Sequence, residues 1–447
     1  MKKNFFNIAF AFSASAVLLS GCMFEQEDFF DESAALRIQH TNEEIKDILC
    51  EQSTNGNGWV MQYFVAGTDD YDFEGFNLFA KFEQSGKVTM ASDHRYLRNG
   101  NANKYTEASS IYQMLAEEGP VLSFNSWNDV ITVFSDPVDP EAAPKNIVSN
   151  GEGMRGDYNL VVTSFSKDKI TLRGERYGAR SCLIPCPLPF EEYIDSIKVI
   201  KSLISNDGVN ALVVTDGTNR LCVTNLQSGL VTLSDRVLDP LSSSLEACVF
   251  DLNGFHFEHK NTIVEGGEEY QDFVFDYEKG CFSEINNPNV VIKPEYENAG
   301  FFVRAMDMGK YWNFASYSEG FADLYSQVNA GATKKKYKFN GIKMTKESDG
   351  RMRVDMVFTT GGKSTAAGFY FDVTDSDENS ITMSYVEPST TNAANVLTAI
   401  PEIQIMLTAL SDKFNVTRAG NNFLSKNIVA TSVTDPSKWF EANYTNK

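Results

Sequence analysis

The chain has 447 residues, enough for two or three domains with cores of their own. Lys and Arg number 39 and Asp and Glu 60, so the formal net charge of −21 repels nucleic acid phosphates and no nucleic acid partner is expected. A hydrophobic content of 42% excludes a disordered chain, and seven cysteines are too few for a disulfide-framed scaffold.

Residues 1–21 have the layout of a lipoprotein signal peptide. Lys2 and Lys3 come before the uncharged residues 5–19, a stretch too short for a membrane span. The following Leu-Ser-Gly-Cys sequence ends at Cys22 and resembles the lipobox of bacterial lipoproteins. We therefore expect acyl chains on Cys22, with outer-membrane lipid as the partner that they enter. The alternative is an ordinary secretory signal in which this cysteine is accidental.

Residues 22–57 are expected to form an acidic tether and a short helix. Five acids between Glu25 and Glu32 keep the tether off anionic lipid. An acidic tract after a lipidated cysteine resembles the export signal of Bacteroidota lipoproteins that reach the cell surface. The expected localisation is therefore the outer membrane, lipid-anchored and exposed at the cell surface. Apolar residues then continue at helical spacing from Leu36 to Leu49, and Gly56 and Gly58 end the helix.

Residues 58–182 show the alternation of half-buried strands. Leu78, Ala80 and Phe82 share one face of a strand, whereas Lys81 and Glu83 point to the other. Similar short runs follow at residues 87–92, 120–127, 130–136, 157–165 and 169–175. Strands at this spacing predict an antiparallel N-terminal barrel or sandwich.

Two further regions follow. Residues 183–292 comprise a stiff joint with Pro185, Pro187 and Pro189, a one-sided helix near residues 194–204, and further strands. Residues 293–447 repeat the meander and contain a helical run at 397–410, where Pro401 marks a kink or a helix start. The sequence thus predicts an all-β protein with minor helices, built from two or three barrel, lipocalin-like or sandwich modules. The first and last regions share a plan that hints at an architectural repeat.

A family resemblance covers most of the chain beyond residue 57. The residues that carry it are 58–64, 77–83, 86–90, 119–125, 134–137, 156–158, 252–255, 271–273, 435–436 and 439–440. They resemble a Bacteroidota lipoprotein family described only as a domain of unknown function. The resemblance supplies no catalytic residues. It implies an accessory role beside outer-membrane uptake systems of the starch-utilisation type, with a transporter complex as partner and a glycan or peptide as ligand.

Two phosphate-binding look-alikes lack the required context. Residues 151–156 match the letters of a dinucleotide fingerprint, but a strand follows them where a helix is needed. The Gly-Lys-Ser sequence at 362–364 lacks the leading glycine of a phosphate loop, so a hairpin turn is expected there. His256 and His259 are three residues apart on an expected strand, which sends their rings to opposite faces. No metal site and no cofactor are therefore expected.

The cysteines and tryptophans leave alternatives open. Beyond Cys22 there are six cysteines, which allow fifteen disulfide pairings or none. The four tryptophans either stack on sugar rings or pack in cores, and Trp59, which opens the first strand, is expected to plug a barrel.

Two functions remain after these exclusions. The first is a non-catalytic binding or accessory protein of a nutrient uptake system. The alternative is a carboxylate-dependent extracellular hydrolase of the glycosidase type, because 60 acids offer many pairs at catalytic spacing. The sequence selects no catalytic residue and no ligand-binding residue.

Overall fold

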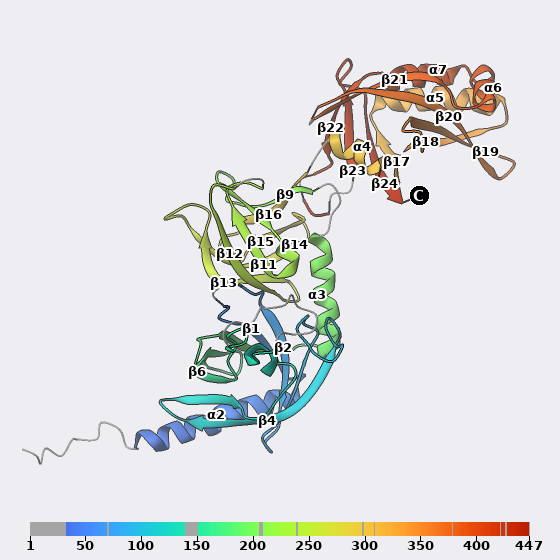
Figure 1. Cartoon of the computed structure of the whole chain (residues 1–447). Coiled ribbons are helices and arrows are strands. Elements are labelled where there is room, and N and C mark those ends of the chain that lie inside the picture. Colours follow the sequence, from blue (N-terminus) through green and yellow to red (C-terminus); the bar gives the residue numbers. More distant parts are fainter. Residues whose placement is uncertain are drawn as a thin grey trace, which may run out of the picture.

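The computed structural model describes residues 33–68, 71–138, 151–204, 209–237, 240–296, 299–307, 309–377, 379–420, 422–424 and 427–446. They form three closed barrels, each of eight antiparallel strands that pair in chain order. The barrels succeed one another along an elongated molecule (Figure 1). The predicted all-β class with minor helices is confirmed, and the number of modules is three.

The first barrel contains the strands β1 (Trp59–Phe64), β2 (Phe76–Phe82), β3 (Lys87–Ser92), β4 (Thr106–Ala116), β5 (Pro120–Phe124), β6 (Asn159–Phe165), β7 (Ile170–Gly174) and β8 (Arg180–Pro185). Trp59 of β1 lies opposite Ala80 of β2 on one side and opposite Pro185 of β8 on the other. This double pairing closes the sheet and leaves no free edge. As the alternation predicts, Leu78 and Phe82 are buried in the core and Lys81 is exposed.

Helix α2 (Ala34–Asn55) packs at the end of the first barrel that faces away from the second (Figure 1). Its buried residues Ile45, Leu49 and Cys50 join the core of the barrel, where Trp59 is also fully buried. The expected position of Trp59 as a barrel plug is thereby confirmed. The helix has 22 residues and is longer than the short helix expected.

Residues 130–136 correct one expectation, because they form no strand. Thr132–Ser135 is a 3₁₀ turn (η2) between β5 and β6, and its Val133 and Phe134 are buried in the core. The Asn128 side chain fixes the start of this segment, since its Oδ1 accepts a hydrogen bond from the Val130 N–H over 3.0 Å. An apolar run that is buried on all sides has no period, so the sequence does not distinguish a turn from a strand here.

The second barrel follows helix α3 (Phe190–Ile204). Its strands are β9 (Val209–Thr215), β10 (Arg220–Thr224), β11 (Leu230–Ser234), β12 (Ser243–Phe250), β13 (Gly254–Thr262), β14 (Glu269–Asp276), β15 (Cys281–Glu284) and β16 (Val291–Tyr296), with a short 3₁₀ turn η3 (Leu226–Ser228). Aromatic rings fill the interior: Phe255 stacks on Phe273 at 5.3 Å and meets Phe282 edge-on at 5.2 Å. Side chains therefore occupy the space in which a lipocalin-like barrel would hold a ligand.

Helix α3 joins the first two barrels, and its predicted one-sided character is confirmed. Ile194, Ile197 and Ile200 are buried on one face of the helix. They belong to a core cluster that also includes Phe79 from the outer face of the first barrel and Phe250 from the second. The two barrels thus share one apolar core across their junction.

The third barrel contains β17 (Lys310–Tyr317), β18 (Lys338–Lys346), β19 (Met352–Thr360), β20 (Lys363–Ser376), β21 (Ser380–Pro388), β22 (Lys413–Arg418), β23 (Asn427–Ser432) and β24 (Trp439–Asn446). Four helices accompany it: α4 (Ala299–Asp307), α5 (Glu319–Lys334), α6 (Thr391–Ala399) and α7 (Glu402–Leu410). Pro401 lies at the N-cap of α7, so it marks a helix start between α6 and α7. The sequence did not predict α4 or α5.

A loop of the third barrel enters the second. Phe423, between β22 and β23, is buried 5.5 Å from the ring of Phe282 and 6.3 Å from that of Phe275. Its N–H donates to the carbonyl oxygen of Gly280 over 2.7 Å. The hydroxyl of Tyr296 donates to the carbonyl oxygen of Asn422 over 2.8 Å. These contacts connect the last two barrels.

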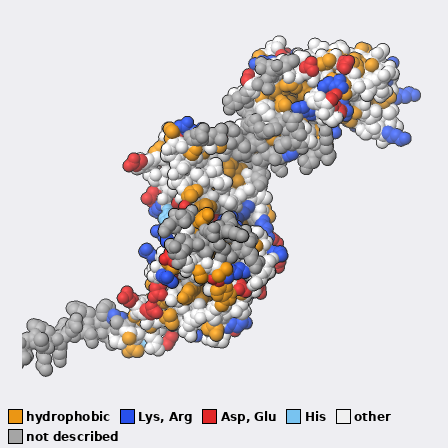
Figure 2. Space-filling model, viewed as in Figure 1, with side chains coloured by type: hydrophobic (Ala, Val, Ile, Leu, Met, Phe, Trp, Pro, Cys, Tyr) orange, Lys and Arg blue, Asp and Glu red, His pale blue; other side chains and the backbone are white. Residues whose placement is uncertain are grey.

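Among the described residues, no single helix has the length and apolar character of a membrane span. The helices α6 and α7, bent by 113° at Pro401, meet that test only as a pair. On the face shown in Figure 2, basic and acidic side chains are interspersed over the barrels.

Candidate functional site

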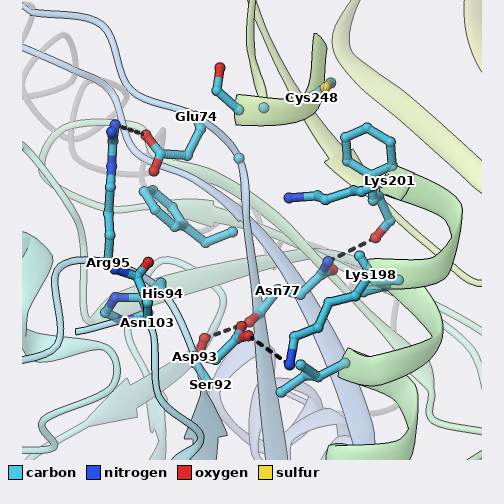
Figure 3. Close-up of a pocket in the computed structure, with 17 residues that line it drawn as sticks. Glu74, Asn77, Ser92, Asp93, His94, Arg95, Asn103, Lys198, Lys201 and Cys248 are labelled. Carbon is cyan, nitrogen blue, oxygen red and sulfur yellow. Dashed lines mark hydrogen bonds and ion pairs between the residues drawn. The ribbon is translucent and has the colours of Figure 1, made fainter. Parts of the chain in front are cut away.

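A cavity of about 330 Å³ lies where the first barrel, helix α3 and the second barrel meet (Figure 3). We call it the Lys201 pocket. The first barrel contributes β2, the segment just before it, the end of β3 and the loop after β3. Helix α3 contributes Ile194, Ile197, Lys198 and Lys201, and the second barrel contributes the end of η3 and the end of β12. Its volume is that of a site for one small molecule.

The walls of the pocket are fixed by contacts within the first barrel and between the two barrels. The Asn77 side-chain amide of β2 donates to the carbonyl oxygen of Phe250 over 2.8 Å, and the Ser92 hydroxyl donates to the carbonyl oxygen of Asn77 over 2.9 Å. Gly75 permits the close approach, since a Cβ there would lie 2.5 Å from side-chain atoms of Phe64 and Val249. The pocket thus lies beside the tightly packed contact of Gly75 and Phe64 with Val249, which we call the apolar seam between the first two barrels.

Lys201 places an ammonium group inside this pocket. Its side chain reaches from the last turn of α3 toward the first barrel, as Figure 3 shows, and lies 4.9 Å from the centre of the Phe250 ring. Burial lowers the pKa of Lys201, because the charged form is poorly solvated there. Within the described part of the chain, no carboxylate oxygen lies within 4.0 Å of this ammonium. Lys198, by contrast, pairs with Asp195 at 2.9 Å.

The acidic side of the pocket is already paired. Glu74 lies 2.6 Å from the guanidinium of Arg95, which also stacks 4.9 Å from the centre of the Tyr96 ring. Burial raises the pKa of Glu74, and the Arg95 charge opposes that rise. Asp93 lies 3.9 Å from Lys198. Among the described residues, Lys201 is therefore the cation of this pocket that has no carboxylate within 4.0 Å, and Glu74 and Asp93 act on it only at longer range.

Two buried acceptor atoms belong to residues that line the pocket. Neither Asn77 Oδ1 nor His94 Nδ1 has a hydrogen-bond partner among the described residues. The Nε2 of His94 lies 2.9 Å from the carbonyl oxygen of Val130, and burial lowers the pKa of His94 to about 4. The ring is therefore neutral near pH 7, with Nδ1 as an acceptor. Buried acceptors without partners favour a ligand that brings hydroxyl or N–H donors.

These features define the chemistry of the pocket. An ammonium with no carboxylate within 4.0 Å in the described part of the chain suits a carboxylate, phosphate or sulfate group, and the amide oxygen of Asn77 suits a hydroxyl group. Phe76, Ile194, Ile197 and Phe250 supply apolar surface for the ligand body. Together they fit a small hydroxylated anion better than a neutral or cationic molecule.

The sequence did not identify any of these residues as a ligand-binding site. Lys198 and Lys201 are spaced as neighbours on one helix, but such lysines usually lie in solvent. Asn77 lies in a segment whose sequence pattern predicts an ordinary half-buried strand. The one feature of the sequence that could have drawn attention to Lys201 is its position in the last turn of an amphipathic helix. The sequence does not show that a barrel packs beside this turn.

The two glycine-containing sequences that resemble phosphate-binding motifs, at 151–156 and 362–364, have structural roles. Gly153 and Gly156 lie in the loop before β6, where the Gly156 N–H donates to the carbonyl oxygen of Phe134. Gly361 and Gly362 have φ values of 53° and 76° and join β19 to β20, so the Gly-Lys-Ser sequence opens a hairpin strand, as predicted.

The histidines and cysteines do not assemble a metal centre in the described residues. His259 Nδ1 lies 3.1 Å from Glu246, whereas His256 lies in the junction between the first two barrels, 5.9 Å from Phe64. Cys50, Cys182, Cys186, Cys222, Cys248 and Cys281 are all free thiols. Cys22 lies outside the described residues, so its predicted acylation stays a prediction.

The tryptophans differ in exposure. Trp59 and Trp312 are fully buried, and Trp439 is half-buried. Trp127 is 49% exposed, with Arg98 5.7 Å from its ring centre. None of the four lines the Lys201 pocket.

A family model described as Domain of unknown function (DUF4302) matches residues 26–277, which is more than half of the chain. The match includes the first barrel, α3 and most of the second barrel, and with them every residue that lines the Lys201 pocket. No curated protein matches the chain at a significant level.

Proposed function

The chain belongs to the DUF4302 family, and we propose that it is a non-catalytic binding protein that holds a small hydroxylated anion between its first two barrels. The observation that carries the proposal is the Lys201 ammonium, which faces the pocket without a carboxylate within 4.0 Å among the described residues. A buried charge that serves packing alone is normally paired within the protein. An acidic sugar supplies the missing carboxylate, hydroxyl donors for Asn77, and a ring face for Phe250.

We propose further that the protein is carried on the outer face of the outer membrane by acyl chains on Cys22. The support is the signal-peptide layout of residues 1–21, the lipobox-like sequence that ends at Cys22, and the acidic tract after it. The family resemblance adds a Bacteroidota source and a place beside a transporter complex of the starch-utilisation type. In this role the pocket retains a nutrient or a fragment of one before uptake.

Calorimetric titration of the mature chain tests the binding function. D-Glucuronate carries both the carboxylate and the hydroxyl groups, and D-glucose lacks the carboxylate. We expect glucuronate to bind at least about tenfold more tightly than glucose, and Lys201→Met to remove that preference. Lys260→Met is the matched control, because Lys260 pairs with Glu269 at 2.8 Å on the surface. Equal affinity for the two sugars, or an unchanged preference in Lys201→Met, contradicts the proposal.

Metabolic labelling with a fatty acid tests the anchor. The wild-type chain should incorporate the label and sediment with membranes, whereas Cys22→Ala should do neither. If the Cys22→Ala chain is labelled and stays bound to the membrane, the anchor is elsewhere.

A carboxylate-dependent hydrolase is the second candidate function. The pocket also contains two carboxyl groups, Glu74, whose pKa is raised by burial, and Asp93, so two acidic residues line the same cavity. In this role Glu74→Gln and Asp93→Asn each abolish release of reducing ends from an acidic polysaccharide. Release that persists in both variants excludes this pair, and no release by the wild-type chain leaves the binding function alone.

A further inference from the structure

A second cavity, of about 570 Å³, lies at the same junction on the other side of the apolar seam. We call it the Arg173 cavity. Phe64 lines it, whereas Gly75, which packs against Phe64 and Val249, lines the Lys201 pocket. The two cavities are therefore separated by the contact between the barrels and are lined by different residues.

The charges around this cavity are segregated by barrel. Its three cations, Lys169, Arg173 and Arg180, all come from β7, β8 and the turn before β7 in the first barrel. Its three carboxylates all come from the second barrel, on β13, β14 and the loop after β12, and they are Asp251, Glu258 and Asp272. One wall is thus positive and the facing wall is negative.

Direct ion pairing between the two walls is limited to one contact among the described residues. The ion pair that spans the cavity is that of Arg180 with Glu258, at 3.8 Å. Among the described residues, Lys169, Arg173 and Asp272 have no oppositely charged side chain within 4.0 Å. If these charges served only to hold the barrels together, closer pairing would be expected, since ion pairs gain most at short range. Lys169, Arg173 and Asp272 line the cavity without such a short-range pair among the described residues.

Between the two charged walls, the lining also includes His256 and Phe64, which we call the floor of the cavity. His256 lies opposite Asp272 in the strand register and meets Phe64 edge-on at 5.9 Å. Burial lowers the pKa of His256, and the nearby Asp272 and Asp251 oppose that effect. The floor is thus neutral and partly aromatic, so charge selection depends on the two walls.

We propose that the Arg173 cavity binds a zwitterionic short peptide. Its terminal carboxylate lies against the guanidinium of Arg173, which offers two parallel donors, and its terminal ammonium lies against Asp272. The volume lies in the range of about 300–1,000 Å³ for small-molecule sites, large enough for more than a single amino acid. The site is independent of the anion pocket at Lys201, so either can fail without the other.

Three forms of one probe test this site on the mature full-length chain. Triglycine is zwitterionic near pH 7, N-acetyl-triglycine lacks the ammonium, and triglycine amide lacks the carboxylate. We expect triglycine to bind with a dissociation constant of about 1 mM or tighter, and each blocked form to bind at least about tenfold more weakly. No triglycine binding at about 10 mM, or equal binding of the three forms, overturns the proposal.

Two variants assign each end of the peptide to its wall. Arg173→Gln should weaken binding of triglycine but leave that of triglycine amide unchanged, and Asp272→Asn should weaken triglycine but not N-acetyl-triglycine. Lys167→Gln is the control, since Lys167 lies near Lys169 but pairs with Glu51 at 2.9 Å. Circular dichroism verifies that each variant is folded. If a variant weakens all three probes equally, its wall does not read the terminal charge and the proposal is wrong.

Discussion

The indole Nε1 of Trp59 donates a hydrogen bond to the carbonyl oxygen of Leu49, 3.0 Å away. The third barrel contains the same arrangement, in which Trp312 of β17 donates to the carbonyl oxygen of Phe302 in α4 over 2.9 Å. In both cases the acceptor lies ten residues before the tryptophan, in the helix that precedes the first strand. The first and third barrels are therefore built on one plan, which the sequence hinted at without showing a residue-level repeat.

Trp59→Phe should lower the free energy of unfolding by about 1–2 kcal/mol, because it removes this hydrogen bond and leaves a void in the core. Urea denaturation followed by fluorescence measures the change. Trp127→Phe is the matched control, since Trp127 is 49% exposed, and it should change stability by less than about 0.5 kcal/mol. Equal effects of the two substitutions would show that the Trp59 hydrogen bond does not stabilise the barrel.

The sequence predicted many, but not all, of the strands in which one face is buried and the other is in solvent. It missed β4 (Thr106–Ala116), in which burial alternates but apolar character does not: polar Ser110 is buried and Ile111 is exposed, so little apolar alternation marks the strand. It also missed α5, in which buried Phe321, Leu324 and Val328 have helical spacing between two strands of the same barrel. A helical interruption inside a meander was expected only at residues 397–410.

The candidate site could not be predicted because it belongs to no single segment. Asn77 and Lys201 are far apart in the chain, and they meet only because α3 lays the second barrel against the outer face of the first. Phe79 shows the signal that was available: it breaks the alternation of β2 and is fully buried on the outside of its barrel. A buried residue on the outer face of a barrel indicates that another part of the chain packs there. It does not show which charged residues that part brings.

Lys201→Met should stabilise the ligand-free protein while it removes anion binding. The methionine keeps apolar contact with Phe250 and relieves the cost of a poorly solvated ammonium, so the free energy of unfolding should rise by about 1 kcal/mol. Chemical denaturation of the ligand-free chain measures this change. Lys260→Met, on the surface, should leave stability within about 0.5 kcal/mol. A marked loss of stability in Lys201→Met would indicate that the ammonium serves the fold and not a ligand.

His94 should make the protein less stable in acid. Its folded-state pKa is about 4, below the ordinary 6.5, so between these values the unfolded chain binds a proton that the folded chain does not. The contribution of neutral His94 to the free energy of unfolding is therefore fully present above pH 6.5. It decreases as the pH drops toward 4, by up to about 3 kcal/mol. Thermal unfolding from pH 7 to pH 4 should show a shallower decline in His94→Gln than in the wild type. His40→Gln, at an exposed position, should reproduce the wild-type decline.

Phe423 should determine whether the third barrel moves with the other two. Its ring is buried beside Phe282 and Phe275 of the second barrel, so Phe423→Ala removes these two ring contacts across the junction. We expect the third barrel to separate from the second, with a larger radius of gyration in X-ray scattering and two unfolding transitions in calorimetry. Leu424→Ala, at the neighbouring 45% exposed position, should leave both measurements unchanged. If Phe423→Ala keeps the wild-type radius and the wild-type number of transitions, contacts such as that of Tyr296 with Asn422 are sufficient to hold the two barrels together.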